Sequence, residues 1–111
     1  MKLMTKEIEQ KLPPLYHFEK TRTEPVAMVK FFDPTGSWTW YVAEGQKQDD
    51  GDWLFFGAVD GFEFEYGYFT LNELKHAKDG CKGIHSLPIE RDLYFHPTSL
   101  HQLQHQAVSG L

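Results

Sequence analysis

A chain of 111 residues, 41% of them hydrophobic, is long enough for one domain with one modest core and too apolar for a disordered chain. Its formal net charge of −5 argues against a surface that binds nucleic-acid phosphates, because that affinity comes mainly from Lys and Arg. The single cysteine, Cys81, excludes an internal disulfide, and no apolar run approaches membrane-spanning length. We therefore expect a cytoplasmic protein whose residues 1–111 form a single domain.

The first predicted element is a short helix over residues 6–12. Thr5 can cap it, because a threonine oxygen accepts a hydrogen bond from a free N–H of the first helical turn. Pro13 and Pro14 end it, since proline cannot donate the hydrogen bond that a helix needs. The next stretch, residues 17–25, is polar, and we expect it to be a simple connection.

The centre of the chain, residues 26–69, predicts a four-stranded antiparallel meander. Runs of strand-forming residues place the strands at residues 26–32, 37–43, 53–59 and 62–69. The segment from Asp33 to Gly36 has the preferred chemistry of a type I turn, and Asp60-Gly61 favours a two-residue type I′ hairpin. Between the second and third strands we expect a polar loop from Glu44 to Asp52.

Both faces of this predicted sheet are apolar. With the expected turns, one face would carry Trp38, Trp40, Trp53, Phe55, Phe64 and Tyr68, and the other would carry Phe31, Tyr41, Leu54 and Phe56. A sheet with two apolar faces needs two covers, which the predicted helices supply only in part. An uncovered remainder could contact a partner or form a homodimer interface.

The last third of the chain predicts two more helices. Thr70 and Glu73 form a capping box for a short middle helix. Residues 87–95 predict a fifth strand or a strap across the sheet, and Thr98 or Ser99 can cap a C-terminal helix over residues 98–107. The expected fold is therefore α+β, a four- to five-stranded antiparallel meander sheet with short N-terminal, middle and C-terminal helices.

Several short motifs together resemble a domain-of-unknown-function family of small bacterial proteins. They are Leu12-Pro13-Pro14-Leu15-Tyr16, Val29-Lys30-Phe31-Phe32, Trp38-Thr39-Trp40-Tyr41, Phe55-Phe56-Gly57, Gly67-Tyr68-Phe69 and Leu87-Pro88-Ile89-Glu90-Arg91-Asp92-Leu93. The resemblance covers about residues 3–95 and leaves out the tail from His96. It implies a gene carried on plasmids, conjugative elements or phages, and it transfers no activity to any residue.

Acidic residues dominate the stretch from Glu44 to Glu65, which has seven acids and one base, Lys47. This balance is typical of a recognition surface for a basic protein, or of a surface that imitates DNA phosphates. Solvated loops at a strand edge would give the same pattern. The candidate partner-binding residues are Asp49, Asp50, Asp52, Glu63 and Glu65.

Two catalytic or metal-binding interpretations of these acids are weaker. The Asp49 to Asp52 segment lacks the alternating ligands and the terminal bidentate Glu of a calcium loop. Glu63 and Glu65 share a strand face and could form an acid–base pair, but that chemistry needs one carboxylate in an apolar site.

Histidines supply the alternative hypothesis of a small metal-dependent enzyme or metal-binding protein. His101 and His105 share a face of the predicted C-terminal helix, and with His96 they could hold zinc. A second possible cluster is His76, Cys81 and His85; as a nucleophile, however, Cys81 has no evident partner base.

The hypothesis that we favour is a non-enzymatic, protein-binding accessory protein of a mobile genetic element. One form of this hypothesis is an inhibitor of host defence, such as restriction or CRISPR, that acts through an acidic surface. It requires no cofactor and no direct contact with nucleic acid or membrane.

Overall fold

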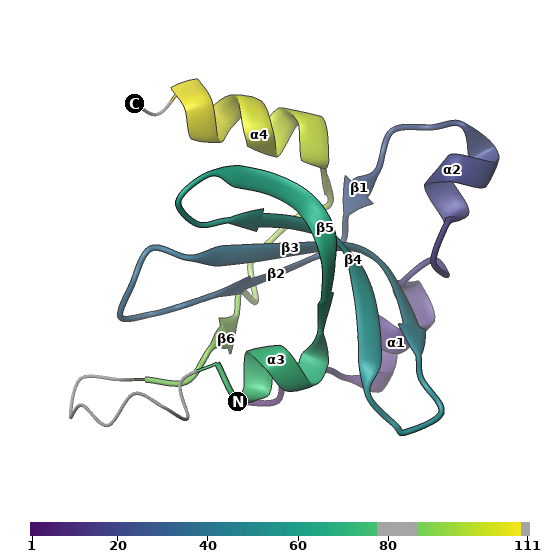
Figure 1. The fold of residues 1–111 in the computed structure, drawn as a ribbon, viewed down its shortest axis with the longest axis horizontal. Helices are drawn as coiled ribbons and strands as arrows, with labels where there is room; N and C mark the ends of the chain where they lie inside the picture. Colours follow the sequence, from purple (N-terminus) through teal and green to yellow (C-terminus); the bar gives the residue numbers. More distant parts are fainter. Residues whose placement is uncertain (78–86, 110–111) are drawn as a thin grey trace.

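The computed structural model describes residues 1–77 and 87–109 (Figure 1). Its centre is a five-stranded antiparallel sheet in the order β5-β4-β3-β2-β6. The strands are β2 (Val29–Phe32), β3 (Thr39–Lys47), β4 (Trp53–Asp60), β5 (Phe64–Thr70) and β6 (Glu90–Arg91). A separate two-stranded antiparallel sheet pairs β1 (Val26–Ala27) with β7 (Thr98–Ser99).

Four short helices accompany the sheets within the described residues, which confirms the predicted α+β class. They are α1 (Lys6–Lys11), α2 (His17–Thr21), α3 (Leu71–Lys75) and α4 (Leu100–Ser109). Thr5 caps α1 as predicted, because its hydroxyl oxygen accepts a 3.2 Å hydrogen bond from the N–H of Ile8. Ser99 does the same for α4 by accepting from the N–H of Gln102 at 3.1 Å.

The expected simple connection over residues 17–25 is wrong, because α2 forms there. Tyr16 and Arg22 flank this helix with left-handed backbone angles, φ of 69° and 55°. The N–H groups of Tyr16 and Phe18 donate to the carboxylate of Glu44. The partner that caps α2 therefore comes from a distant strand, where local patterns give no sign of it.

The polar loop expected from Glu44 is also wrong at its start, because β3 continues to Lys47. Val42 pairs with Gly57, and Glu44 pairs with Phe56, so Ala43 is an extra residue in the ladder. Such a β-bulge shifts the alternation of the strand. Glu44 consequently shares the sheet face of Phe56, where it is buried.

The predicted two-residue hairpin between the third and fourth strands is wrong. Asp60 pairs with Phe64, which leaves Gly61, Phe62 and Glu63 as a three-residue connection. Among the described glycines only Gly51 has a positive φ, whereas a type I′ turn needs positive φ at both central residues. Gly61 instead permits close packing, because a Cβ there would lie 2.8 Å from the indole of Trp38.

The longer connection changes which faces the aromatic residues occupy. A shift of strand register by an odd number of residues exchanges the two faces. Phe64 and Tyr68 therefore do not share a face with Trp53 and Phe55 as expected; Phe64 packs with the opposite cluster, and Tyr68 is exposed. Phe31 pairs directly with Trp40 and so also lies on the other face from the one expected.

Two apolar clusters cover the two faces of the sheet, as the sequence predicted. The first contains Leu3, Leu12, Phe31, Val42, Phe55, Phe69, Leu71 and Leu74, among others, and lies under α1 and α3. The second contains Ala27, Ala43, Ala58, Leu100 and Leu103, and α4 covers it on the opposite side (Figure 1). Full burial of a ring such as Phe55 stabilises the fold by roughly 2 kcal/mol.

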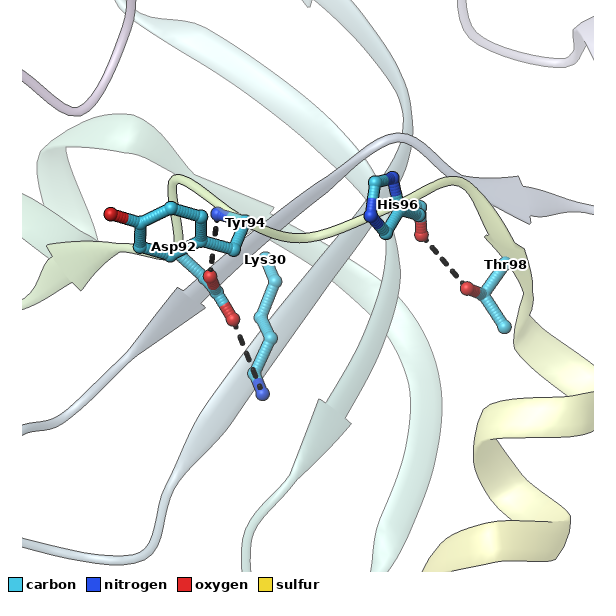
Figure 2. A network of polar contacts seen from close by, with 5 residues as sticks. All are labelled: Lys30, Asp92, Tyr94, His96 and Thr98. Carbon is cyan, nitrogen blue, oxygen red and sulfur yellow. Dashed lines mark hydrogen bonds and ion pairs between the residues drawn. The ribbon is translucent and has the colours of Figure 1, made fainter.

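Residues 92–97 form a strap that leads from β6 to β7 (Figure 2). The N–H of Asp92 donates to the carbonyl of Lys30 at 2.9 Å, and the carboxylate of Asp92 lies 3.8 Å from the Lys30 ammonium. The same carboxylate accepts from the N–H of Tyr94 at 2.9 Å. The sequence predicted a strand or a strap over residues 87–95, and the structure has both, first the strand β6 and then the strap.

None of the helices in residues 1–77 and 87–109 combines the length and apolar character needed to cross a membrane.

Candidate functional site

The predicted acidic surface falls into two separate groups. Asp49 and Asp50 are exposed in the β3–β4 turn, and Glu63 and Glu65 are exposed at the β4–β5 end. The first and last of the eight residues of β4 lie about 23 Å apart, at 3.3 Å for each step from one residue to the next. Figure 1 shows the two turns at opposite ends of β4. One compact partner site cannot use all of these acids.

Asp52, the fifth candidate, has a structural role. Its carboxylate accepts a 2.7 Å hydrogen bond from the N–H of Trp53 and a 3.0 Å hydrogen bond from the N–H of Asn72. Asn72 stands in the first turn of α3, where free N–H groups and the helix dipole favour an acid. Asp52 therefore joins the β3–β4 turn to α3.

An aromatic and acidic surface lies at the β4–β5 end, and we call Trp38, Phe62, Glu63 and Glu65 the hairpin surface. Phe62 is 94% exposed, although its ring packs edge-on against Trp38, with 5.4 Å between ring centroids and 84° between planes. Trp38 is 37% exposed and in turn packs on Trp40 at 6.2 Å. The exposed ring of Phe62 therefore lies against one ring of a tilted tryptophan pair.

A shallow cavity of about 200 Å³ adjoins Phe62. Its lining is Trp38, Val59, Gly61, Phe62, Glu63 and Glu65, which includes two carboxylates and no Lys or Arg. Aromatic residues at the centre with charged residues at the rim are typical of protein–protein interfaces. The sequence predicted the acids of this surface but placed Trp38 with the aromatic residues of one sheet face.

The histidines proposed as zinc ligands do not form a cluster. Within residues 1–77 and 87–109, no three His, Cys, Asp or Glu side chains are arranged to hold a metal ion. His101 and His105 are exposed on α4, and His96 lies on the strap, where its carbonyl accepts from the Thr98 hydroxyl at 2.8 Å (Figure 2). Cys81 and His85 lie outside the described residues, so the second cluster stays a prediction.

Glu44 is the residue that sequence analysis placed wrongly among the solvated acids. It is only 3% exposed, and its two oxygens accept hydrogen bonds of 2.9 Å from the N–H of Tyr16 and 2.8 Å from that of Phe18. Burial of a carboxylate is costly unless it is hydrogen-bonded, and these two donors supply that compensation. Only the bulge at Ala43 brings Glu44 to this face, and no sequence signal marks the bulge.

A second cavity, which we call the Glu44 cleft, opens beside this carboxylate. Its volume is about 330 Å³, and its main lining residues are Tyr16, Phe18, Glu19, Glu44, Phe56 and Tyr68. Desolvation, followed by the Tyr16 phenol and by the charges of Glu44 and Glu19, raises the pKa of the Tyr68 phenol. The cleft is therefore aromatic and electronegative.

Comparison with curated proteins and with solved structures finds no match. The DUF2958 family model, described as a protein of unknown function, matches residues 3–107. This match extends beyond the expected limit near residue 95 and includes most of α4. The chain therefore belongs to the DUF2958 family.

Proposed function

We propose that the protein is a non-enzymatic, protein-binding accessory protein that contacts its partner through the hairpin surface. The observation that carries this proposal is the packing of Phe62, which is 94% exposed yet held edge-on by Trp38. Water contacts nearly the whole of this large apolar ring, and a partner that covers it would remove that contact.

Charge at the rim defines the chemistry of the partner. Glu63 and Glu65 are exposed beside the aromatic pair, and the cavity there is lined by no basic residue. Two carboxylates favour a partner with Lys or Arg around an apolar pocket, and they speed association with it. Proteins that bind nucleic acid commonly have such basic surfaces.

The narrower part of the proposal concerns biological context. The sequence motifs resemble proteins of plasmids, conjugative elements and phages, where accessory genes often act against host defence. A restriction or CRISPR protein with a basic surface would suit the hairpin surface in charge. Inhibition would then follow if the hairpin surface occupies a region that the host protein needs for nucleic acid.

A comparison of two charge reversals tests the proposal. The full chain and its Glu63→Lys/Glu65→Lys variant are used to capture proteins from lysate of the native host, and mass spectrometry identifies what is retained. Asp49→Lys/Asp50→Lys is the matched control, since it changes net charge equally at the other end of β4. We expect a protein that is captured by the wild type and the control and lost from the hairpin variant. Equal capture by all three, with all three folded, would refute the proposal.

Self-association is an alternative use of the same surface. A homodimer would cover Phe62 and Trp38, but it would bring Glu63 and Glu65 of two copies close together. Like charges directly opposed are destabilising. Sedimentation at low and high salt separates the two cases, because a dimer held by this surface would strengthen as salt screens the repulsion.

A further inference from the structure

The Glu44 cleft is built on a row of three side chains that crosses the sheet. Glu44 on β3 pairs with Phe56 on β4, and Phe56 pairs with Tyr68 on β5. Directly paired residues lie on one face, with Cβ atoms about 5 Å apart. The rings of Phe56 and Tyr68 are 5.2 Å apart between centroids. An acid and two aromatic rings therefore form one continuous wall.

Residues at the start of α2 form the opposite side of the cleft. Tyr16 and Phe18 both line it, and their N–H groups donate to the carboxylate of Glu44. The acid of the first wall thus fixes the backbone that carries the second wall. The aromatic rings are positioned by these hydrogen bonds and by the sheet, so the cleft exists before any ligand arrives.

The electrostatics of the cleft favour a positive ligand. Glu19 and Glu44 line it, and no Lys, Arg or His does. Desolvation and the Tyr16 phenol are the larger causes of the raised pKa of the Tyr68 phenol, and the charges of Glu44 and Glu19 add to it. Aromatic faces also attract cations through their electron density, and most strongly where water is partly excluded.

We propose that the Glu44 cleft binds a Lys or Arg side chain of a partner protein. Its aliphatic stem would lie between the aromatic walls and its charged group would lie near Glu44 and Glu19. The cleft is open at the surface, and Tyr16 and Tyr68, both about half exposed, stand at its rim, which suits a side chain presented by another protein. This inference does not depend on the hairpin surface, whose residues are separate from these.

Direct titration with small probes tests whether the Glu44 cleft binds a basic side chain. The probes are the capped tripeptides acetyl-Gly-Lys-Gly-amide and acetyl-Gly-Arg-Gly-amide, their neutral counterpart with norleucine, and tetramethylammonium as a free cation. Each is added to the ¹⁵N-labelled full chain while amide NMR shifts are recorded. We expect the Lys or Arg peptide to shift the amides of Tyr16, Phe18 and Tyr68, and the norleucine peptide to bind at least about tenfold more weakly.

Two substitutions at one position identify the contribution of the ring. Tyr68→Phe keeps the aromatic face, and Tyr68→Leu removes it while remaining apolar; Tyr94→Leu, on the exposed strap, is the control. Binding of the basic peptide should persist in Tyr68→Phe and Tyr94→Leu and weaken at least about fivefold in Tyr68→Leu. Thermal unfolding of each variant verifies that it is folded.

Every other outcome contradicts the inference. Equal binding of the norleucine peptide would mean an apolar cleft without charge preference. Binding of tetramethylammonium without either basic peptide would assign the cleft to a free cation. Absence of shifts with all probes, in a folded protein, would mean that the cleft is no binding site.

Discussion

The ring of Phe62 meets the indole of Trp38 edge-on, at 5.4 Å and 84°, so two residues separated by two strands of the chain form one exposed aromatic unit. Gly61 makes this contact possible, because any Cβ at that position would lie within 3 Å of the indole. The same glycine is thus part of both the turn and the candidate binding surface. The expected effects of substitutions elsewhere follow from equally specific contacts.

Loss of the Asp52 carboxylate should weaken α3. It accepts from the N–H groups of Trp53 and Asn72, and an Asp52→Ala variant leaves both without this acceptor. We expect the free energy of unfolding to fall by about 1 kcal/mol, the usual contribution of a helix cap. Urea denaturation measures it, and Asp49→Ala is the control because Asp49 is exposed in the same turn. Equal stability of the two variants would argue against a structural role for Asp52.

Gly57 on β4 pairs with Gly67 on β5, but an added methyl group should destabilise the protein only at Gly57. A Cβ at Gly57 would lie 1.7 Å from the carbonyl oxygen of Tyr41, whereas a Cβ at Gly67 meets nothing within 4 Å. In Gly57→Ala the free energy of unfolding should fall by roughly 3 kcal/mol or more, since the backbone must move to make room for the methyl group. In Gly67→Ala the free energy of unfolding should stay the same or rise by roughly a few tenths of a kcal/mol, because glycine is a poor strand residue. Chemical denaturation of both variants decides it; similar losses would contradict the packing described for Gly57.

Replacement of Glu44 by glutamine should loosen α2. The carboxylate accepts from two N–H groups, but a side-chain amide has one oxygen and would direct its own N–H₂ at a second donor. A cost of about 1–3 kcal/mol is expected for the unsatisfied groups. Hydrogen exchange at the amide of Phe18 should accelerate in Glu44→Gln, whereas exposed Glu19→Gln serves as the control. Unchanged exchange would mean that Glu44 does not hold the helix.

Stability should decline at alkaline pH through Tyr41. Burial, with smaller effects from Asp60 and Asp92, raises the pKa of its phenol above the ordinary value of 10.0. The folded protein then keeps a proton that the unfolded chain releases, so this contribution is complete below about pH 10 and is lost as pH rises through the folded pKa. Urea midpoints measured on both sides of about pH 10 should fall less for Tyr41→Phe than for the wild type. Equal falls of the urea midpoint in the wild type and in Tyr41→Phe would contradict a stabilising contribution from the protonated Tyr41 phenol.

The sequence was sufficient where the determinants of structure are local. Thr5 and Thr70 cap the helices that they were predicted to cap. Runs of strand-forming residues also located the strands of the sheet, although the single strand predicted over residues 26–32 is wrong, because it divides into β1 and β2, which belong to different sheets. The placement of Trp40 and Tyr41 on opposite faces was also correct, since the side-chain period of a strand is fixed by the backbone. These features supported the fold class and the need for two covers.

Determinants that act over long distances were missed. The bulge at Ala43 depends on pairing with β4, and it is what turns Glu44 from an expected loop acid into a buried cap for α2. Likewise, Trp38 packing on Gly61 accompanies a three-residue hairpin, although Asp60-Gly61 favours a shorter one. The acidic candidates were found by composition, but composition could not show that β4 separates them into two groups.

The most direct test of protein binding through the hairpin surface is a quantitative capture experiment with two exposed aromatic residues. Phe62→Ala and Tyr94→Ala each remove an aromatic ring that is at least 87% exposed, so neither should change stability by more than about 0.5 kcal/mol. The proteins that each variant retains from host lysate are compared with those of the wild type by mass spectrometry. We expect Phe62→Ala to retain its principal partner about tenfold less and Tyr94→Ala to retain it fully. Undiminished retention by Phe62→Ala would contradict the proposed use of this surface.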